Sequence, residues 1–157
     1  MTDISADSRG ETEGNPLERQ RELMELLSQE TRHKIIQTLL GHPKLLASAD
    51  EINHFIPSKS KKTIQEQLDV LVGADILAIY EYPPNKEKRG LPWKFYGVTE
   101  YGADILADFN YLKGVPMARA VHQKTRKTEK IERHETAPRP PLPESIRTTF
   151  RLDDEAE

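Results

Sequence analysis

Apolar residues recur at helical spacing through the first third of the chain. One stripe consists of Leu17, Leu23, Met24, Leu26 and Leu27, and a second consists of Ile35, Ile36, Leu39 and Leu40. The two stripes predict helices over residues 17–27 and 29–40. Ser28 is the expected N-cap of the second helix, and Gly41 followed by Pro43 is a stop signal.

Two further helices are predicted at short intervals. Ser48 and Glu51 have capping-box spacing and open a short helix over residues 49–55. Either Ser58 or Ser60 caps the next helix, which ends near residues 73–75. Its buried stripe consists of Ile64, Leu68, Leu71 and Val72.

The spacing of apolar residues then changes from helical to alternating. Residues 77–82 and 93–98 are rich in aromatic and β-branched side chains, which predicts the two strands of a hairpin. The connecting residues 83–92 are polar, and they are too many for a tight turn. We expect Trp93 and Phe95 to lie in the core, in preference to a stacking platform for single-stranded nucleic acid.

The remaining helices complete a known order of elements. Thr99 is the expected cap of a helix over residues 100–111, and Pro116 begins a last helix that runs to Lys127 or Lys130. The order is helix, helix, short helix, helix, hairpin, helix, which is that of a winged helix-turn-helix. The sequence therefore predicts a mostly α fold with a β-hairpin wing, in a dimeric protein.

Composition divides the chain into three parts. Residues 1–15 form an acidic tail that we expect to be disordered, residues 16–127 the winged helix-turn-helix domain, and residues 128–157 a Pro-rich, acidic tail. The net charge of −3 hides an uneven distribution, because residues 1–15 and 144–157 each carry −3 and leave +3 on residues 16–143. A basic body is what a nucleic-acid-binding protein requires.

Several classes of site are disfavoured by composition. The chain has no cysteine, which excludes disulfides and thiolate metal sites. The five histidines are scattered without metal-ligand spacing and are expected at the surface or at its boundary with the core, and no catalytic arrangement or phosphate loop is recognisable. We therefore expect no enzyme, no cofactor and no metal. No apolar run approaches the roughly 20 residues that span a bilayer, and we expect a cytoplasmic protein.

Cationic residues occur where a winged helix-turn-helix protein meets DNA. The helix predicted after Ser58 opens with candidate contacts to phosphates and base edges: Lys59, Ser60, Lys61, Lys62, Thr63 and Gln65. The hairpin adds Lys86, Lys88, Arg89 and Lys94. A solvated helix start and a solubilising loop are the plainer alternatives, but lysines at a helix N-terminus oppose the macrodipole and give the fold no benefit. Gln65 fits base contact and ordinary surface equally well.

Three segments resemble ArsR-type winged-helix repressors, archaeal members above all. Residues 26–36, with a polar turn before Thr31 and Arg32, resemble the opening of that family. Residues 60–71 resemble its recognition helix, and Val98 to Gly102 resembles the Leu-Thr-Glu-x-Gly that closes the wing, as in MarR- and PadR-like proteins. The resemblance implies a transcription regulator that binds double-stranded DNA as a homodimer.

The resemblance also implies how two copies associate. The first helix and the terminal helices would form the dimer interface, with Leu17, Leu23, Met24, Leu27, Leu112, Val115 and Val121. One departure is Asp75 where the family has glycine, so that either Asp75 or Gly73 makes the left-handed turn. The absence of cysteine, with only His122 on the last helix, argues against the family's metal sensing. The alternative function is a winged-helix protein–protein interaction module of the transcription or replication machinery.

Overall fold

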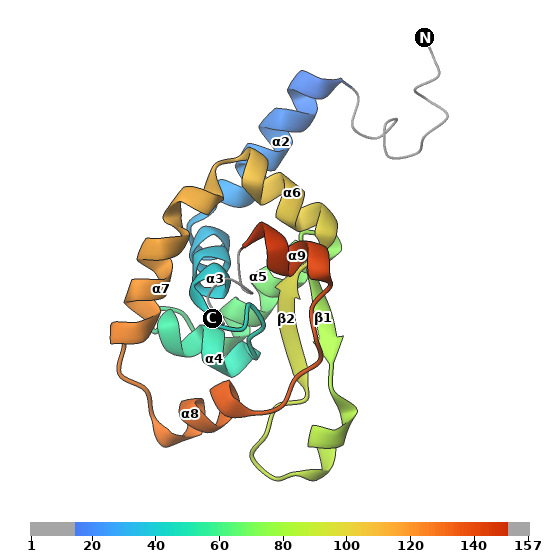
Figure 1. Cartoon of the computed structure of the whole chain (residues 1–157). Coiled ribbons are helices and arrows are strands. Elements are labelled where there is room, and N and C mark those ends of the chain that lie inside the picture. Colours follow the sequence, from blue (N-terminus) through green and yellow to red (C-terminus); the bar gives the residue numbers. More distant parts are fainter. Residues whose placement is uncertain (1–14, 151–157) are drawn as a thin grey trace.

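The computed structural model describes residues 15–150, which form helices around one two-stranded sheet. The α-helices are α2 (Pro16–Ser28), α3 (Glu30–Gly41), α4 (Ala49–Phe55), α5 (Lys61–Gly73), α6 (Glu100–Asp108), α7 (Val115–Lys124), α8 (Glu129–Thr136) and α9 (Glu144–Thr149). The strands are β1 (Leu77–Glu81) and β2 (Lys94–Val98), and two 3-10 helices are η2 (Pro83–Glu87) and η3 (Tyr111–Gly114). Figure 1 shows α2 at one end of the molecule and the loop of the hairpin at the other.

Side-chain caps fix the starts of most helices. The capping box of Ser48 and Glu51 is present at α4, and Ser60 caps α5 by accepting a hydrogen bond from the amide of Thr63. Thr99 caps α6, as the sequence predicts. The prediction for α3 was wrong by one residue: Gln29 is the N-cap and accepts from the amide of Arg32, because α2 continues through Ser28.

The hairpin joins α5 through a left-handed residue. Asp75 has φ of 65°, so the turn after α5 is made by Asp75 and not by Gly73. The strands then pair antiparallel from Leu77 opposite Val98 to Glu81 opposite Lys94. Phe95 is fully buried, as predicted, whereas Trp93 is only partly buried at the foot of the loop.

The loop of the hairpin is ordered by one buried amide. Asn85, in η2, is 1% exposed, and its Nδ2 donates to the carbonyl oxygens of Pro92 at 2.9 Å and of Pro138 at 2.8 Å. The second bond connects the hairpin loop (residues 82–93) to the C-terminal part of the chain. A loop expected to be extended is thereby held in one conformation.

The core lies between α3, α4, α5 and the hairpin. Its fully buried side chains include Ile35, Ile36, Leu39, Ile52, Ile64, Leu68, Leu71, Ile76, Leu77 and Phe95. These residues are the helical and alternating stripes of the sequence, which turn inward because burial of apolar surface is the main favourable term in folding.

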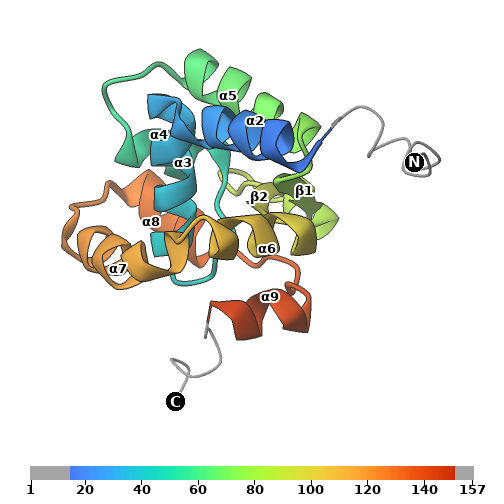
Figure 2. The same cartoon turned by 90° about the horizontal axis from the view of Figure 1, so that it is seen from above.

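The structure corrects the end of the last predicted helix and adds two helices within the predicted C-terminal tail. The expected last helix ends at Lys124, and Thr128 caps a separate helix, α8. Between 128 and 150 the chain contains two helices, and Ile131, Leu142, Ile146 and Phe150 are buried. Figure 2 shows α9 beside α6, against which it packs. Isolated apolar residues among prolines and charges carry no helical stripe, so only packing reveals them.

The rest of the predicted tails lies outside the described residues. Of the N-terminal tail, residues 1–14 lie outside, as do residues 151–157 of the C-terminal tail.

A close approach between α6 and the start of the hairpin explains one glycine of the family-like motif. A Cβ on Gly102 would lie 2.1 Å from the carbonyl oxygen of Ile76, which is backbone and cannot move aside. The same oxygen accepts from the amide of Thr99 at 3.0 Å, and Thr99 Oγ1 donates to the carbonyl of Asp75 at 2.6 Å. Glycine is therefore required at position 102 because any Cβ would collide with the Ile76 carbonyl, and not because the backbone has a positive φ.

We predict that Gly102→Ala destabilises the protein by at least about 2 kcal/mol, as overpacking against backbone does. Gly73 is the matched control, because a Cβ there meets nothing within 4 Å and the residue ends α5. Gly73→Ala should be neutral or stabilising by up to about 1 kcal/mol. Urea unfolding of the three proteins measures both values, and equal midpoints for the two variants would contradict the assignment.

Candidate nucleic-acid interface

The start of α5 presents its cations to solvent. We call residues 59–63 the α5 tip. Ser60 Oγ accepts from the amide of Thr63 at 3.1 Å and donates to Thr63 Oγ1 at 3.1 Å, which fixes the first turn. Asn53 Nδ2 donates to the carbonyl of Lys59 at 2.9 Å, so α4 holds the chain leading into the tip. Lys61 and Lys62 are exposed on this fixed turn.

An acidic residue of α4 lies among the cations. Asp50 accepts from Lys61 at 2.9 Å, and Lys130 of α8 lies 3.6 Å from its other oxygen. Burial alone would raise the pKa of Asp50, but the hydrogen bond from Lys61 and the charges of the two lysines outweigh it and hold the pKa below its ordinary value. Asp50 is therefore a carboxylate at neutral pH, and it ties α8 to the α5 tip.

Trp93 organises the cations of the hairpin. The ammonium of Lys86 lies 4.2 Å from the centre of the indole ring, and that of Lys94 lies 4.9 Å from it. Both distances are those of cation–π contacts. Lys88 and Arg89 are exposed at the end of the loop. Trp93 thus serves as a platform for two lysines, which explains why it is not in the core.

A cleft opens between the start of α4, the hairpin loop and α8, and the α5 tip adjoins it through the ion pair of Lys61 with Asp50. We call it the cationic cleft; its volume is about 430 Å³ and its lining includes Asp50, Trp93, Lys94, Lys130 and Arg133. Gln65 connects α5 to the hairpin, because its Nε2 donates to the hydroxyl of Tyr96 in β2 at 2.6 Å. The amide nitrogen of Gln65, a candidate base contact, is therefore engaged within the protein.

The candidate dimerisation residues fall into two groups. Leu23, Leu27 and Val115 are 3–7% exposed and pack inside the chain itself. The second group is exposed, with Leu17 at 77%, Met24 at 53%, Leu112 at 37% and Val121 at 53%. Met117, which the sequence analysis did not select, is 71% exposed one turn before Val121. We call Leu17, Met24, Leu112, Met117 and Val121 the apolar strip.

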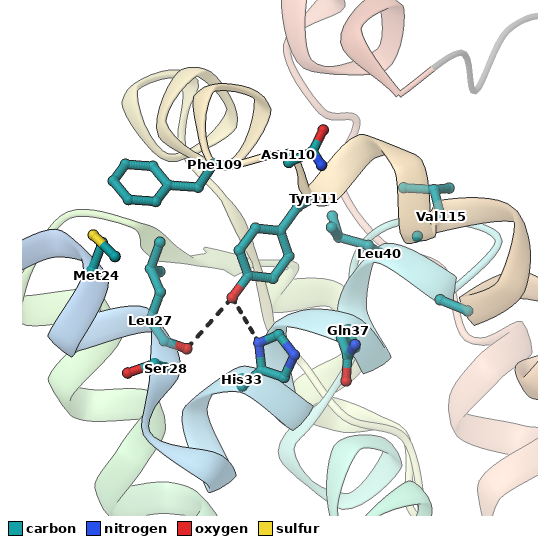
Figure 3. Close-up of a pocket in the computed structure, with 12 residues that line it drawn as sticks. Met24, Leu27, Ser28, His33, Gln37, Leu40, Phe109, Asn110, Tyr111 and Val115 are labelled. Carbon is teal, nitrogen blue, oxygen red and sulfur yellow. Dashed lines mark hydrogen bonds between the residues drawn. The ribbon is translucent and has the colours of Figure 1, made fainter. Parts of the chain in front are cut away.

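Two pockets lie along this strip. The first, of about 430 Å³, opens between α2, α3 and the start of α7, with Met24, Leu27, Leu40 and Val115 among its walls. Figure 3 shows Tyr111 reaching across it, with His33 Nδ1 2.7 Å from the hydroxyl oxygen. The second pocket, of about 400 Å³, is lined by Met117 and Val121 and shares Gln37, Gly114 and Ala118 with the first. Together they make one furrow beside α7.

A buried carboxylate positions α4 against the C-terminal segment. Glu51 Oε1 accepts from the amide of Ser48 at 3.0 Å, and Oε2 accepts from Nε2 of His42 at 3.1 Å. Since Nδ1 of His42 accepts from the amide of Lys44 at 3.0 Å, His42 is the neutral tautomer with its proton on Nε2. The guanidinium of Arg139 lies 3.6 Å from Glu51 Oε1, and both side chains are at most 5% exposed.

Three histidines meet around this carboxylate, contrary to their expected place at the surface. His42, His122 and His134 are 1–6% exposed. His134 Nδ1 lies 2.8 Å from Ser48 Oγ, and the rings of His42 and His122 meet edge to face at 5.2 Å. Sequence reasoning had no signal for the cluster, because its members are far apart in the chain. Within residues 15–150 no group of histidine and carboxylate side chains is arranged to hold a metal ion.

None of the helices in the described part of the chain is both long and apolar enough to cross a membrane.

Comparison with known proteins identifies the architecture. No family model matches the chain, and no curated protein matches it. A solved structure from Halomicrobium mukohataei, described as a protein with a GntR superfamily winged-helix-turn-helix domain, is similar with a TM-score of 0.76. The two chains are 25% identical, and the match covers 84% of this chain and 94% of that one. The fold is therefore a winged helix-turn-helix, mostly α with a two-stranded β-hairpin as its wing.

The buried histidines predict acid sensitivity. Burial, together with the nearby charge of Lys127, lowers the pKa of His122 to about 4 from 6.5, and Glu135 offsets this only in part. The folded state thus holds His122 neutral while the unfolded chain binds a proton below pH 6.5. Stability is fully present above pH 6.5 and falls as the pH drops toward 4.

We expect His122 to contribute about 1–2 kcal/mol to that loss. Denaturant unfolding at a series of pH values measures the effect. His122→Gln should flatten the pH dependence over this interval, and a variant with the wild-type slope would show that His122 is not the group responsible.

Proposed function

We propose that this protein is a transcription regulator that binds specific sites in double-stranded DNA as a homodimer. The observation that carries the proposal is that the α5 tip and the hairpin, which are the helix and the wing of this winged helix-turn-helix fold, both present exposed cations. No catalytic step, cofactor or metal enters the proposal.

The distribution of charge along α5 favours insertion by its N-terminal end. Lys61 and Lys62 are in the first turn, whereas the exposed acids Glu66 and Asp69 come later. In helix-turn-helix proteins the N-terminal residues of the recognition helix approach the base edges in the major groove. The helix dipole also favours a phosphate at this end. Thr63 belongs to the same first turn and Gln65 begins the next one, within reach of base edges if the bond of Gln65 to Tyr96 exchanges.

The hairpin supplies a second contact. Lys86 and Lys94 are held on Trp93, and Lys88 and Arg89 extend beyond it. A preorganised basic loop loses less conformational entropy on binding than a flexible one. It would follow the backbone or enter the minor groove beside the groove that α5 occupies.

Two copies would associate through the apolar strip. Met24, Met117 and Val121 line the furrow and are exposed, as are Leu17 of α2 and Leu112 of η3, and large exposed apolar patches mark interaction sites. A two-fold axis through this face would present two α5 tips to successive major grooves of a pseudo-palindromic site. The buried Leu23, Leu27 and Val115 would support the interface from beneath.

The finer family assignment stays a prediction. The motifs of the sequence resemble ArsR-type repressors, whereas the similar solved structure carries a GntR superfamily domain. We retain the ArsR-like, archaeal type as part of the proposal. The two residues that carry the motif have structural roles: Thr99 accepts a hydrogen bond from the amide of Gly102, and Gly102 packs against the backbone of Ile76.

We predict that Lys61→Ala with Lys62→Ala abolishes specific DNA binding at physiological salt. Each phosphate contact contributes roughly 0.9 to the slope of log affinity against log salt, so the double variant should lower that slope by about 2. Fluorescence anisotropy with genomic duplexes across a salt series measures both quantities.

Lys113→Ala is the control, because Lys113 is exposed in η3 beside the apolar strip. It should leave affinity and slope unchanged. A Lys61/Lys62 variant that folds and binds DNA like the wild type would refute the assignment. Wild-type protein that binds no duplex at any salt concentration would favour the protein–protein module instead.

We predict that Val121→Glu converts the dimer into a monomer, because an isolated carboxylate cannot be buried in an apolar interface without a large cost. Analytical ultracentrifugation should show half the wild-type mass, and affinity for a palindromic site should fall at least about a hundredfold as the second half-site is lost. Gln123→Glu, an exposed change on the same helix, is the control. A Val121→Glu protein of unchanged mass would exclude this interface.

A further inference from the structure

The helix α8 carries two exposed cations on one face. Lys130 and Arg133 are three residues apart and exposed, so they are neighbours on the surface, and we call them the cationic face. Glu129 lies one turn before Arg133, whereas Glu132 lies on the side of the helix away from Lys130. The buried Ile131 and His134 attach the helix to the protein.

The cationic face of α8 points into the gap between the α5 tip and the hairpin. Lys130 shares the carboxylate of Asp50 with Lys61 of the tip. Arg133 lies beside the hairpin loop, its Nε 3.7 Å from where a Cβ on Gly90 would be. Figure 1 shows α8 and the hairpin loop at the same end of the molecule. One short helix therefore joins two groups of cations that are separate in the sequence.

The cationic cleft lies between α8, the hairpin loop and the start of α4. Three cations line it, Lys94, Lys130 and Arg133, and the one carboxylate in its described lining, Asp50, is already paired with lysines. Its volume of about 430 Å³ admits a phosphate group with its solvation.

We propose that α8 and the base of the hairpin form a third contact with the DNA backbone, and that the cationic cleft receives a phosphodiester of that backbone. The proposal rests on the proposed function and adds an element outside the winged helix-turn-helix itself. DNA is the occupant favoured here because the cleft adjoins both proposed DNA contacts: Asp50 in its wall is paired with Lys61 of the α5 tip, and Lys94 of the hairpin lines it. A backbone strand that follows both elements would pass α8.

The position of α8 is fixed before any ligand binds. His134 is bonded to Ser48 at 2.8 Å, and the guanidinium of Arg139 donates to the carbonyl oxygens of His134 and Glu135. Contacts to phosphates position a protein on DNA without reading its sequence. The role of α8 is therefore to add affinity and set register, equally for all sequences.

The test is Lys130→Gln with Arg133→Gln in the full chain. We expect affinity to fall by the same factor for a specific and an unrelated duplex, and the salt slope to fall by about 2. Between 50 and 200 mM salt the wild type should then lose roughly tenfold more affinity than the variant. Glu132→Gln is the control, because Glu132 is exposed on the side of α8 away from Lys130, and it should leave the salt slope unchanged.

Asp50→Asn is the second variant, because we expect it to raise the affinity for DNA, and a misfolded protein would not show such a gain. Removing this carboxylate frees Lys61 and Lys130, so DNA should bind more tightly and with a steeper salt dependence. An unchanged affinity in Asp50→Asn, or loss confined to one sequence in the α8 variant, would overturn the inference.

The outcomes separate this inference from the proposed function. If Lys61 and Lys62 are needed for binding while the α8 variant keeps the wild-type affinity and slope, the third contact is wrong and the function stands. If the wild-type chain binds no duplex, the proposed function fails and the third contact fails with it.

Discussion

One buried carboxylate, that of Glu51, connects three parts of the chain that lie far apart in the sequence. It caps α4 by accepting a hydrogen bond from the amide of Ser48, and it accepts a second from Nε2 of His42 at the end of α3. It also faces the guanidinium of Arg139 in the C-terminal segment. Burial alone would raise its pKa, but these donors and the charge of Arg139 keep it below the ordinary value. A buried charge is tolerated only when it is paired and hydrogen-bonded on all sides, so the three parts have to come together at once.

The surface chemistry of the protein depends on this interior arrangement. Arg139 also donates to the carbonyl of Leu46 at 2.5 Å and stacks 4.4 Å from the ring centre of Phe95, so it fixes the C-terminal segment against the hairpin. From that anchor α8 extends beside Asp50, and the hairpin loop is held by Asn85 through the carbonyl of Pro138. The cations of the α5 tip, α8 and the hairpin are therefore carried on one rigid base. Rigid placement of charge is what allows several weak phosphate contacts to act together.

The opposite end of the molecule has a different chemical character. Leu17 and Met24 of α2 and Met117 and Val121 of α7 are exposed, and the two pockets beside them combine apolar walls with polar side chains such as His33, Gln37 and Asn110. A protein with cations at one end and an apolar furrow at the other is suited to bind a charged polymer and a second copy of itself at the same time. The two surfaces are linked by α3, which packs against both α5 and α7.

The sequence by itself determined the features that depend on neighbouring residues. Helical and alternating stripes, the caps of Ser48, Ser60 and Thr99, the hairpin and the left-handed turn near Asp75 follow from local backbone chemistry and from burial of one face. Only the tertiary structure shows that residues 128–150 contain packed helices and that His42, His122 and His134 are buried together. It also shows which leucines of α2 remain at the surface. Those outcomes depend on contacts between residues tens of positions apart. No local pattern predicts that Ile131 and His134 are buried, because the position of α8 depends on contacts with Ser48 and Arg139.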